Sequence, residues 1–229
     1  MKNLWKILFK NRRILYSAIF LGFSIAAVPT GAEAKNQKNN ELQEENLDDM
    51  DFIELLHSVD VGDASELIQK FQAKEGKTRL LNGKYSPQGE CTVEAYRNKE
   101  VLLLTIPAHL LFGPNMTELK AEADEYLLPI KRYLKHPDTY RVLLVMHTDN
   151  TGSEAYREDI TRERVESVYE WFETEGSDTS YLFSFALSDD MPLYPNNSME
   201  NRDRNRRLEI YLVPGRKMVE QAKSGRIAF

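Results

Sequence analysis

The chain has 229 residues, a length that suits one domain with extensions or two small domains. Hydrophobic residues make up 41% of it and charged residues 29%, which is typical of a soluble globular protein with long polar segments. The formal net charge of −6 argues against nucleic acid and anionic membrane surfaces as partners.

Residues 1–34 have the pattern of a secretory signal peptide. An apolar run from Ile14 to Val28 follows a basic segment, and Ala32 and Ala34 supply small residues for cleavage. The run has about fifteen residues, whereas a membrane-spanning helix needs ~20. We therefore expect cleavage after Ala34 and a protein that is periplasmic or associated with the outer membrane. The alternative is an uncleaved leader that remains as an anchor.

Cleavage would change the charge of the protein. The leader carries five basic residues and one acidic residue, a net charge of +4, so its removal takes the formal charge from −6 to −10. A mature protein this acidic is a poor ligand for nucleic acid.

A polar linker and a helical extension are predicted to follow the leader. Residues 35–50 are Asn, Gln, Lys and Glu with almost nothing apolar, which predicts a disordered linker. Residues 51–90 form an N-terminal extension with a short amphipathic helix over 52–58. The apolar side chains of this extension need a surface to pack on, either the following domain or a partner protein.

A second helix is predicted over 64–75. Asp63 and Glu66 have the spacing of a capping box, and Leu67, Ile68 and Phe71 follow at helical intervals. The remaining residues of the extension, 77–90, contain two glycines and a proline and are predicted to form a loop.

Two strands and a helix are predicted next. Residues 91–97 and 101–106 read as a β-hairpin around a turn at 98–100. Asn115 opens a predicted helix that ends near Pro137. Its apolar face consists of Leu119, Ala123, Tyr126, Leu127, Ile130 and Leu134.

The last part of the chain alternates strands and helices. Thr161 is the predicted N-cap of a helix that ends at Gly176, which would place Arg164 in the first turn. The other predicted elements are strands over 141–147, 181–187 and 207–213, a helical turn near 199–205, and a basic tail over 214–229 that can add a helical turn or two.

This order of elements predicts an α/β fold, an α+β sandwich of the βαβαβ type. A single mixed sheet would have its helices packed on one face, preceded by a short helical segment. Cys91, the only cysteine, can form no internal disulfide and is expected to be a small buried residue.

A carboxylate and a guanidinium are the candidate binding groups. Asp149 falls in the loop that leaves the strand 141–147, and ligands commonly sit at such strand ends. Arg164 follows fifteen positions later. Such a pair can hold both charged ends of an amino acid. It can equally be a structural ion pair, because such pairs mimic sites.

Several stretches, in their order and spacing, resemble the OmpA-like C-terminal domain family over about residues 91–213. They are Leu103, Thr105, Ile106 and Pro107 with Leu111 and Phe112; Leu119, Lys120, Ala121 and Ala123; His147 to Gly152; Tyr156; Ile160, Thr161 and Arg164; and Arg202 with Asn205 to Ile210. The resemblance implies the βαβαβ fold and non-covalent binding of peptidoglycan.

The resemblance also implies roles for particular residues. Asp149 would accept hydrogen bonds from the free ammonium of diaminopimelate in the stem peptide, and Arg164 would pair with its carboxylate. Arg157, Ile160 and Phe112 would lie at the pocket. Arg206 is a further candidate ligand contact, although such an arginine more often anchors the last strand.

The sequence departs from the family pattern at several positions. Arg157 stands where the family has an asparagine that contacts the ligand, so it either adds a contact to the carboxylate or competes for Asp149 and closes the pocket. Met146 stands where a glycine is usual. Ala186 and Ser188 replace two glycines, and Asp189 with Asp190 makes the following loop more acidic.

Two functions remain open. The first is a peptidoglycan-binding module that tethers an envelope protein or layer, joined through residues 35–90, to the cell wall. The second is an OmpA-like scaffold or interaction protein that has lost the ligand. No nucleophile motif, phosphate loop or paired-carboxylate signature indicates an enzyme or a cofactor. His147 and Asp149 alone are too few ligands to indicate a metal.

The leader yields the first testable prediction. N-terminal sequencing of the exported protein is expected to start at Lys35, because the small residues at Ala32 and Ala34 suit signal peptidase. Recovery of Met1 on a membrane-bound protein would instead support the uncleaved anchor.

Overall fold

The computed structural model describes residues 47–75, 80, 85 and 90–228. The predicted leader, residues 35–46 of the linker and most of the loop at 77–90 lie outside the described residues. The chain divides into two units, Met1–Leu55 and Leu56–Phe229.

The described part of the first unit contains a capping box that the sequence analysis missed. The Asp51 N–H donates to Glu54 Oε2 at 2.8 Å, and the Glu54 N–H donates to Asp51 Oδ1 at 2.9 Å. Two backbone donors at the start of α2 (Phe52–Leu56) are thereby satisfied. The box predicted at Asp63 does not form, since Asp63 itself lies in a 3-10 turn, η4 (Gly62–Ala64), that leads into α3 (Ser65–Glu75).

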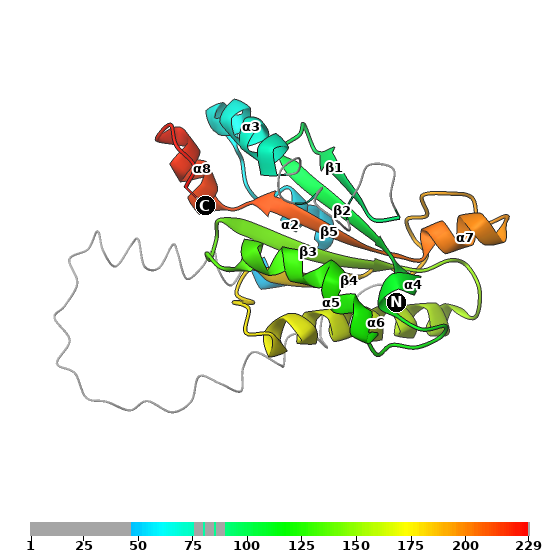
Figure 1. The fold of residues 1–229 in the computed structure, drawn as a ribbon. Helices are drawn as coiled ribbons and strands as arrows, with labels where there is room; N and C mark the ends of the chain where they lie inside the picture. The colour runs from blue at the N-terminus through cyan, green and yellow to red at the C-terminus, as the bar shows by residue number, and fades with distance from the viewer. Residues whose placement is uncertain (1–46, 76–79, 81–84, 86–89, 229) are drawn as a thin grey trace. The chain divides into compact units, whose positions relative to one another are not determined.

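The second unit is built on one five-stranded mixed sheet (Figure 1). Its strands are β1 (Thr92–Tyr96), β2 (Val101–Pro107), β3 (Tyr140–His147), β4 (Leu182–Ala186) and β5 (Arg207–Pro214). The order across the sheet is β1-β2-β5-β3-β4. β3 and β4 are parallel, and the other neighbouring pairs are antiparallel. The predicted hairpin, mixed sheet and final strand are confirmed.

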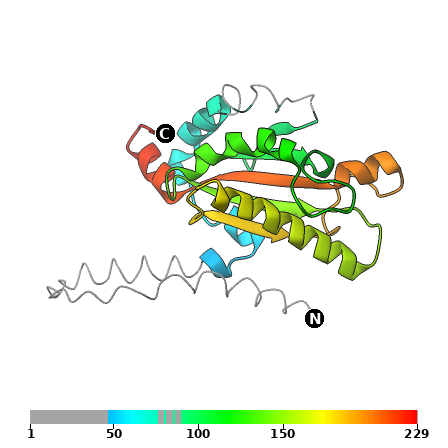
Figure 2. The same ribbon diagram turned by 60° about the horizontal axis from the view of Figure 1, so that its bottom comes forward.

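Helices pack on one face of this sheet. The remaining elements are α4 (Ala108–Leu111), η6 (Ala121–Ala123), α5 (Asp124–Leu127), η7 (Leu128–Leu134), α6 (Glu154–Thr174), α7 (Met199–Asn205) and α8 (Arg216–Lys223). In both ribbon views α7 lies at one end of the strands, and α3 and α8 lie at the other (Figures 1 and 2). None of the described helices has the length and apolar composition needed to cross a membrane.

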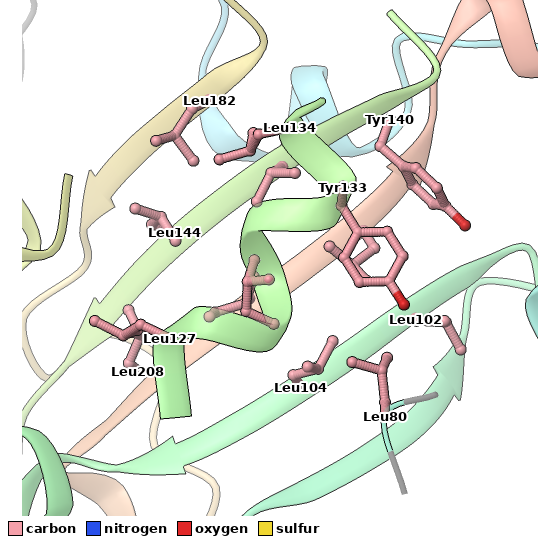
Figure 3. Close-up of a cluster of buried hydrophobic side chains, with 14 of the residues drawn as sticks. Leu80, Leu102, Leu104, Leu127, Tyr133, Leu134, Tyr140, Leu144, Leu182 and Leu208 are labelled. Atoms are coloured by element: carbon pink, nitrogen blue, oxygen red, sulfur yellow. The ribbon is translucent and has the colours of Figure 1, made fainter. Parts of the chain in front are cut away.

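The core lies between the sheet and the helical segment α5–η7. Leu144 of β3 and Leu208 of β5 point from the sheet toward Leu127 and Leu134 of that segment (Figure 3). Alternate residues of β3 and β5 join the same buried cluster, as the two-residue period of a strand requires. Cys91 is buried, as expected for this residue.

The helix predicted from Asn115 begins later than expected. Asn115 has φ +56°, in the left-handed region, so it cannot start a right-handed helix. Leu119 instead forms a β-bridge with Phe112, and helical structure starts at Ala121. Pro129 has no N–H to donate, and the segment around it is a 3-10 helix. The predicted apolar face is largely kept, since Ala123, Leu127, Ile130 and Leu134 are buried.

The predicted N-cap at Thr161 is wrong. α6 starts at Glu154, and its N-cap is Ser153, whose hydroxyl accepts a hydrogen bond from the Tyr156 N–H. No glycine or proline interrupts the chain between these positions, so the helix runs on through Thr161. The Thr161 hydroxyl donates to the Arg157 carbonyl at 2.8 Å, as threonines inside helices do. Arg164 therefore lies in the middle of α6, and the helix N-terminus cannot assist it.

A buried polar network joins α3 to the sheet. Gln72 is fully buried, and its side-chain amide donates to the Glu100 carbonyl at 2.8 Å and to the Leu212 carbonyl at 3.3 Å. Its side-chain oxygen accepts from the Tyr140 hydroxyl at 2.8 Å. Ile68 of the same helix is in the core cluster. The second predicted helix of the extension therefore packs on the domain that follows it, which is one of the two surfaces expected from the sequence.

The Gln72 network leads to a stability prediction. Gln72→Ala is expected to lower the free energy of unfolding by about 2–3 kcal/mol, because it removes the buried hydrogen bonds that Gln72 makes to Glu100, Leu212 and Tyr140. Urea unfolding measures the change. Gln69→Ala is the matched control, since Gln69 is on the same helix and its amide donates only locally, to Ser65. Equal effects of the two substitutions would show that the network does not hold α3.

Candidate functional site

The candidate site lies where β3 ends and β5 begins. His147 is opposite Arg207 in the last cross-strand pair of these antiparallel strands. The loop that carries Asp149 leaves β3 at this point, and α7 enters β5 through Arg206. Thus two residues that are 57 positions apart in sequence meet at one end of the sheet.

Asp149 is buried and makes three hydrogen bonds. Its Oδ1 accepts from the Thr151 N–H at 2.7 Å and from the Thr151 hydroxyl, and its Oδ2 accepts from Arg206 Nη1. Its exposed fraction is 1%. Burial alone would raise the pKa of this carboxyl, but the hydrogen bonds from Thr151 and the Arg206 charge together lower it. Asp149 is therefore an ionised acceptor at neutral pH.

Arg206 has a rigid backbone and a more accessible side chain. Its N–H donates to the Arg202 carbonyl, and its carbonyl accepts from the Ala108 N–H at 2.9 Å. The guanidinium is 37% exposed and also donates to Asp203 Oδ1 at 2.8 Å. The ion pair between Arg206 and Asp149 was not predicted from the sequence, which suggested Arg164 as the partner of Asp149.

Two backbone carbonyls accept hydrogen bonds from Arg164. Its Nε donates to the Met116 carbonyl at 2.9 Å and its Nη2 to the Gly113 carbonyl at 3.4 Å, while the guanidinium lies 4.9 Å from the centre of the Phe112 ring. Arg164 is 5% exposed, and no carboxylate pairs with it among the residues that the structure describes. Burial lowers the pKa of Arg164, and the charge of Arg206 lowers it further.

The arrangement leaves one positive charge uncompensated. Asp149 is paired with Arg206, whereas Arg164 is a buried cation without an anion in the described chain. Buried charges are normally paired, so a buried guanidinium that lacks a carboxylate partner in the described chain is suited to bind a carboxylate. An anion bound there would use the charge-assisted hydrogen bonds that Arg164 can still make.

Arg157 does not fill the space at Asp149. Its Nε donates to Asp189 Oδ1 at 2.7 Å, and its Nη1 donates to the Gly152 carbonyl at 2.8 Å. The cation that replaces the usual asparagine is thus held by the acidic loop after β4. Ile160 is buried on α6, and Phe112 lies under Arg164. The contacts of the described chain therefore join Phe112 to Arg164 and Arg157 to Asp189, whereas Ile160 is placed only by its burial on α6.

A buried ionic cluster that was not predicted from the sequence lies next to the site. Glu209 accepts from Arg207 Nε at 2.8 Å and from the Tyr211 hydroxyl at 2.6 Å, and it contacts His147 Nε2 at 3.2 Å. Burial opposes ionisation of Glu209, but these partners lower its pKa to about 2. Burial lowers the pKa of His147. The signal that could have found the cluster is the run of polar residues at alternate positions of β5.

The match to known proteins covers the residues that form this site. Residues 111–206 match the model of the OmpA family. This part of the chain is an OmpA-family domain. It includes Asp149, Arg157, Arg164 and Arg206, and excludes α2, α3 and α8.

Two curated relatives resemble about half of the chain. The chain is 33% identical over 105 residues to the outer-membrane lipoprotein YfiB of Pseudomonas aeruginosa. The matched residues make up 46% of this chain and 62% of the lipoprotein. It is 27% identical over 122 residues to the probable lipoprotein YiaD of Escherichia coli, which is 53% of this chain and 56% of that protein. These matches therefore span less than two thirds of each relative.

Among solved structures, a putative MotB-like protein from Desulfovibrio vulgaris resembles the chain with a TM-score of 0.57 and 28% identity. The likeness covers 66% of this chain and 98% of that one. An OmpA-like domain with a five-stranded mixed sheet is thus shown by both sequence and structure.

The Glu209 cluster predicts a pH dependence of stability. Because the folded-state pKa of Glu209 is below its ordinary value of 4.5, its contribution is present above pH 4.5 and is lost as the pH falls through about 2. The shift corresponds to a contribution on the order of 3 kcal/mol. Urea unfolding between pH 7 and pH 2.5 is expected to show a smaller loss of stability for Glu209→Gln than for the wild type.

Asp159→Asn is the control for this experiment, because Asp159 is an exposed carboxylate paired with Arg162 on the surface of α6. Its pH profile should follow that of the wild type. If the Glu209→Gln profile also follows the wild type, Glu209 does not carry the acid sensitivity.

Proposed function

We propose that the domain binds peptidoglycan non-covalently, by holding the free ammonium and carboxylate of diaminopimelate in the stem peptide. The observation that carries the proposal is Arg164, a buried guanidinium with two carbonyl partners and no carboxylate among the described residues. A ligand carboxylate would supply the missing negative charge. Phe112 would hold the guanidinium plane in place beneath it.

The ammonium of the ligand would be received by Asp149. This carboxylate is ionised and held by Thr151, so it offers a rigid acceptor. An acceptor and a donor that are preorganised within one protein recognise a zwitterion at little cost in entropy. No bond is made or broken in this binding, and the protein acts as an anchor rather than an enzyme.

The tethered partner would be attached through residues 35–90. Within this stretch, α3 packs at the end of the strands that is opposite to α7 and the candidate site (Figures 1 and 2). A partner joined there would leave the end of the sheet with Asp149 free to reach the cell wall. The leader, if cleaved, would place the complex in the periplasm or at the outer membrane.

A scaffold that has lost the ligand is the second candidate. The observation in its favour is that Arg206 already pairs with Asp149, which satisfies the acceptor inside the protein. Under this function, Arg157 and Asp189 would serve a protein partner. The same experiment distinguishes the two candidates.

Binding to purified sacculi tests the proposal. Wild-type protein lacking residues 1–34 is expected to sediment with sacculi, and Asp149→Ala or Arg164→Ala is expected to remove most of the binding. Each substitution leaves a ligand charge desolvated and unpaired, which typically costs ~2–5 kcal/mol, or roughly 30-fold or more in affinity.

An ion-paired acid and base on α6 provide matched controls. Asp159 and Arg162 pair with each other at 2.7 Å, and no hydrogen bond or ion pair of the described chain joins either of them to Asp149, Arg164 or Arg206. Asp159→Ala and Arg162→Ala therefore change the same residue types outside the contacts of the proposed site. Both controls should bind like the wild type. If the wild type binds sacculi no better than the folded double variant Asp149→Ala, Arg164→Ala, the scaffold function replaces the proposal.

A further inference from the structure

Arg206 occupies the place that an incoming ammonium would need. Thr151 uses Asp149 Oδ1 with both its N–H and its hydroxyl, and Arg206 Nη1 uses Oδ2. With an exposed fraction of 1%, Asp149 offers no open approach beside these partners. A ligand ammonium can therefore pair with Asp149 only by taking the position of the Arg206 guanidinium.

Arg206 can leave Asp149 without unfolding anything. Its backbone is held at the end of α7, so only the side chain has to turn. The guanidinium is 37% exposed and has a second partner, Asp203, which is itself 48% exposed. After the exchange Arg206 would keep the Asp203 contact, so its charge would not be left unpaired.

Arg164 has no such internal substitute. Its partners are two carbonyls, and its buried charge is neutralised by no carboxylate of the described chain. The two halves of the site are therefore unequal: the acceptor is already satisfied by the protein, and the donor is not.

Resting on the proposed function, we infer that Arg206 is a specificity-determining residue that stands in for the ligand's ammonium. A ligand that lacks the ammonium leaves Arg206 on Asp149 and still neutralises Arg164. A ligand that lacks the carboxylate must displace Arg206 and leaves Arg164 unpaired. The site accordingly selects the carboxylate strictly and the ammonium loosely, and it rejects ligands that carry an ammonium alone, such as a lysine side chain.

Four synthetic stem tripeptides, L-Ala-γ-D-Glu-X, test this asymmetry. In the parent peptide X is meso-diaminopimelate, and in the second peptide it is diaminopimelate amidated at the carboxylate that lies beside the free ammonium. In the third peptide X is L-lysine. In the fourth it is 2-aminopimelate, which keeps that carboxylate but has no free ammonium. Calorimetric titration of the wild type is expected to show losses of about 30-fold or more for the amide and lysine peptides. The aminopimelate peptide should stay within about fivefold of the parent, since one ion pair only replaces another.

Arg206→Gln removes the substitute cation. In this variant the aminopimelate peptide is expected to bind about 10-fold or more weakly than the parent, because Asp149 is then buried without a cation. The parent peptide should bind at least as tightly as to the wild type, since its ammonium no longer competes. Arg204→Gln is the control, because Arg204 is on the same helix and pairs with Glu200 on the surface.

The outcomes separate this inference from the function on which it rests. Failure of the wild type to bind the parent peptide overturns both. Binding of the parent with equal losses for the amide and aminopimelate peptides overturns the role of Arg206 and leaves peptidoglycan binding intact. An Arg206→Gln profile that matches the wild type across the four peptides also overturns it.

Discussion

The pairing of β3 with β5 is the constraint on which the site depends. Antiparallel register brings His147 opposite Arg207, and this places the loop after β3 against the residue before β5. Asp149 meets Arg206 because of that register. A shift by one residue would turn every side chain of the strand to the other face of the sheet and would separate the two residues. The ionic cluster of His147, Arg207 and Glu209 spans the same two strands. A shift of register would separate these buried partners, and a broken buried pair is costly.

The two charged groups of the candidate site, Asp149 and Arg164, are compensated unequally. The charge of Asp149 is compensated by the side chain of Arg206, whereas Arg164 is held by the Gly113 and Met116 carbonyls and the Phe112 ring, with no carboxylate partner in the part of the chain that the structure describes. In such a site the acceptor Asp149 already has a cation as its partner, and the donor Arg164 has no anion in the described chain. When it binds a zwitterion, the site exchanges a partner at one end and gains a partner at the other. Such an exchange stabilises the complex mainly through the carboxylate, which is why the two charged groups of the ligand are expected to contribute unequally.

The sequence predicted the strands better than the helices, and for physical reasons. β3 and β5 are short apolar or alternating runs, and their buried faces override other local preferences. The start of α6 was misplaced because Thr161 and Ser153 are both acceptable N-cap residues. The structure shows that the residues between them are helical, so Ser153 is the N-cap. Asn115 looked like a cap but takes a left-handed conformation that local pattern does not reveal. The Arg206–Asp149 pair joins segments 57 positions apart, so no local signal could indicate it.

The departures from the family pattern compensate one another. Ser188 has φ +49°, a conformation that glycine adopts without strain, and the family usually has glycine in this segment. Its carbonyl accepts from the Thr148 N–H at 2.8 Å, and its neighbour Asp189 binds Arg157 at 2.7 Å. Arg157, through Gly152, then ties the loop after β4 to the loop that carries Asp149. A larger cation at position 157 and an acid at position 189 are thus two halves of one contact that braces the Asp149 loop. Because that contact draws Arg157 away from Asp149, the replacement of asparagine leaves Arg206, and not Arg157, as the cation that a ligand would have to displace.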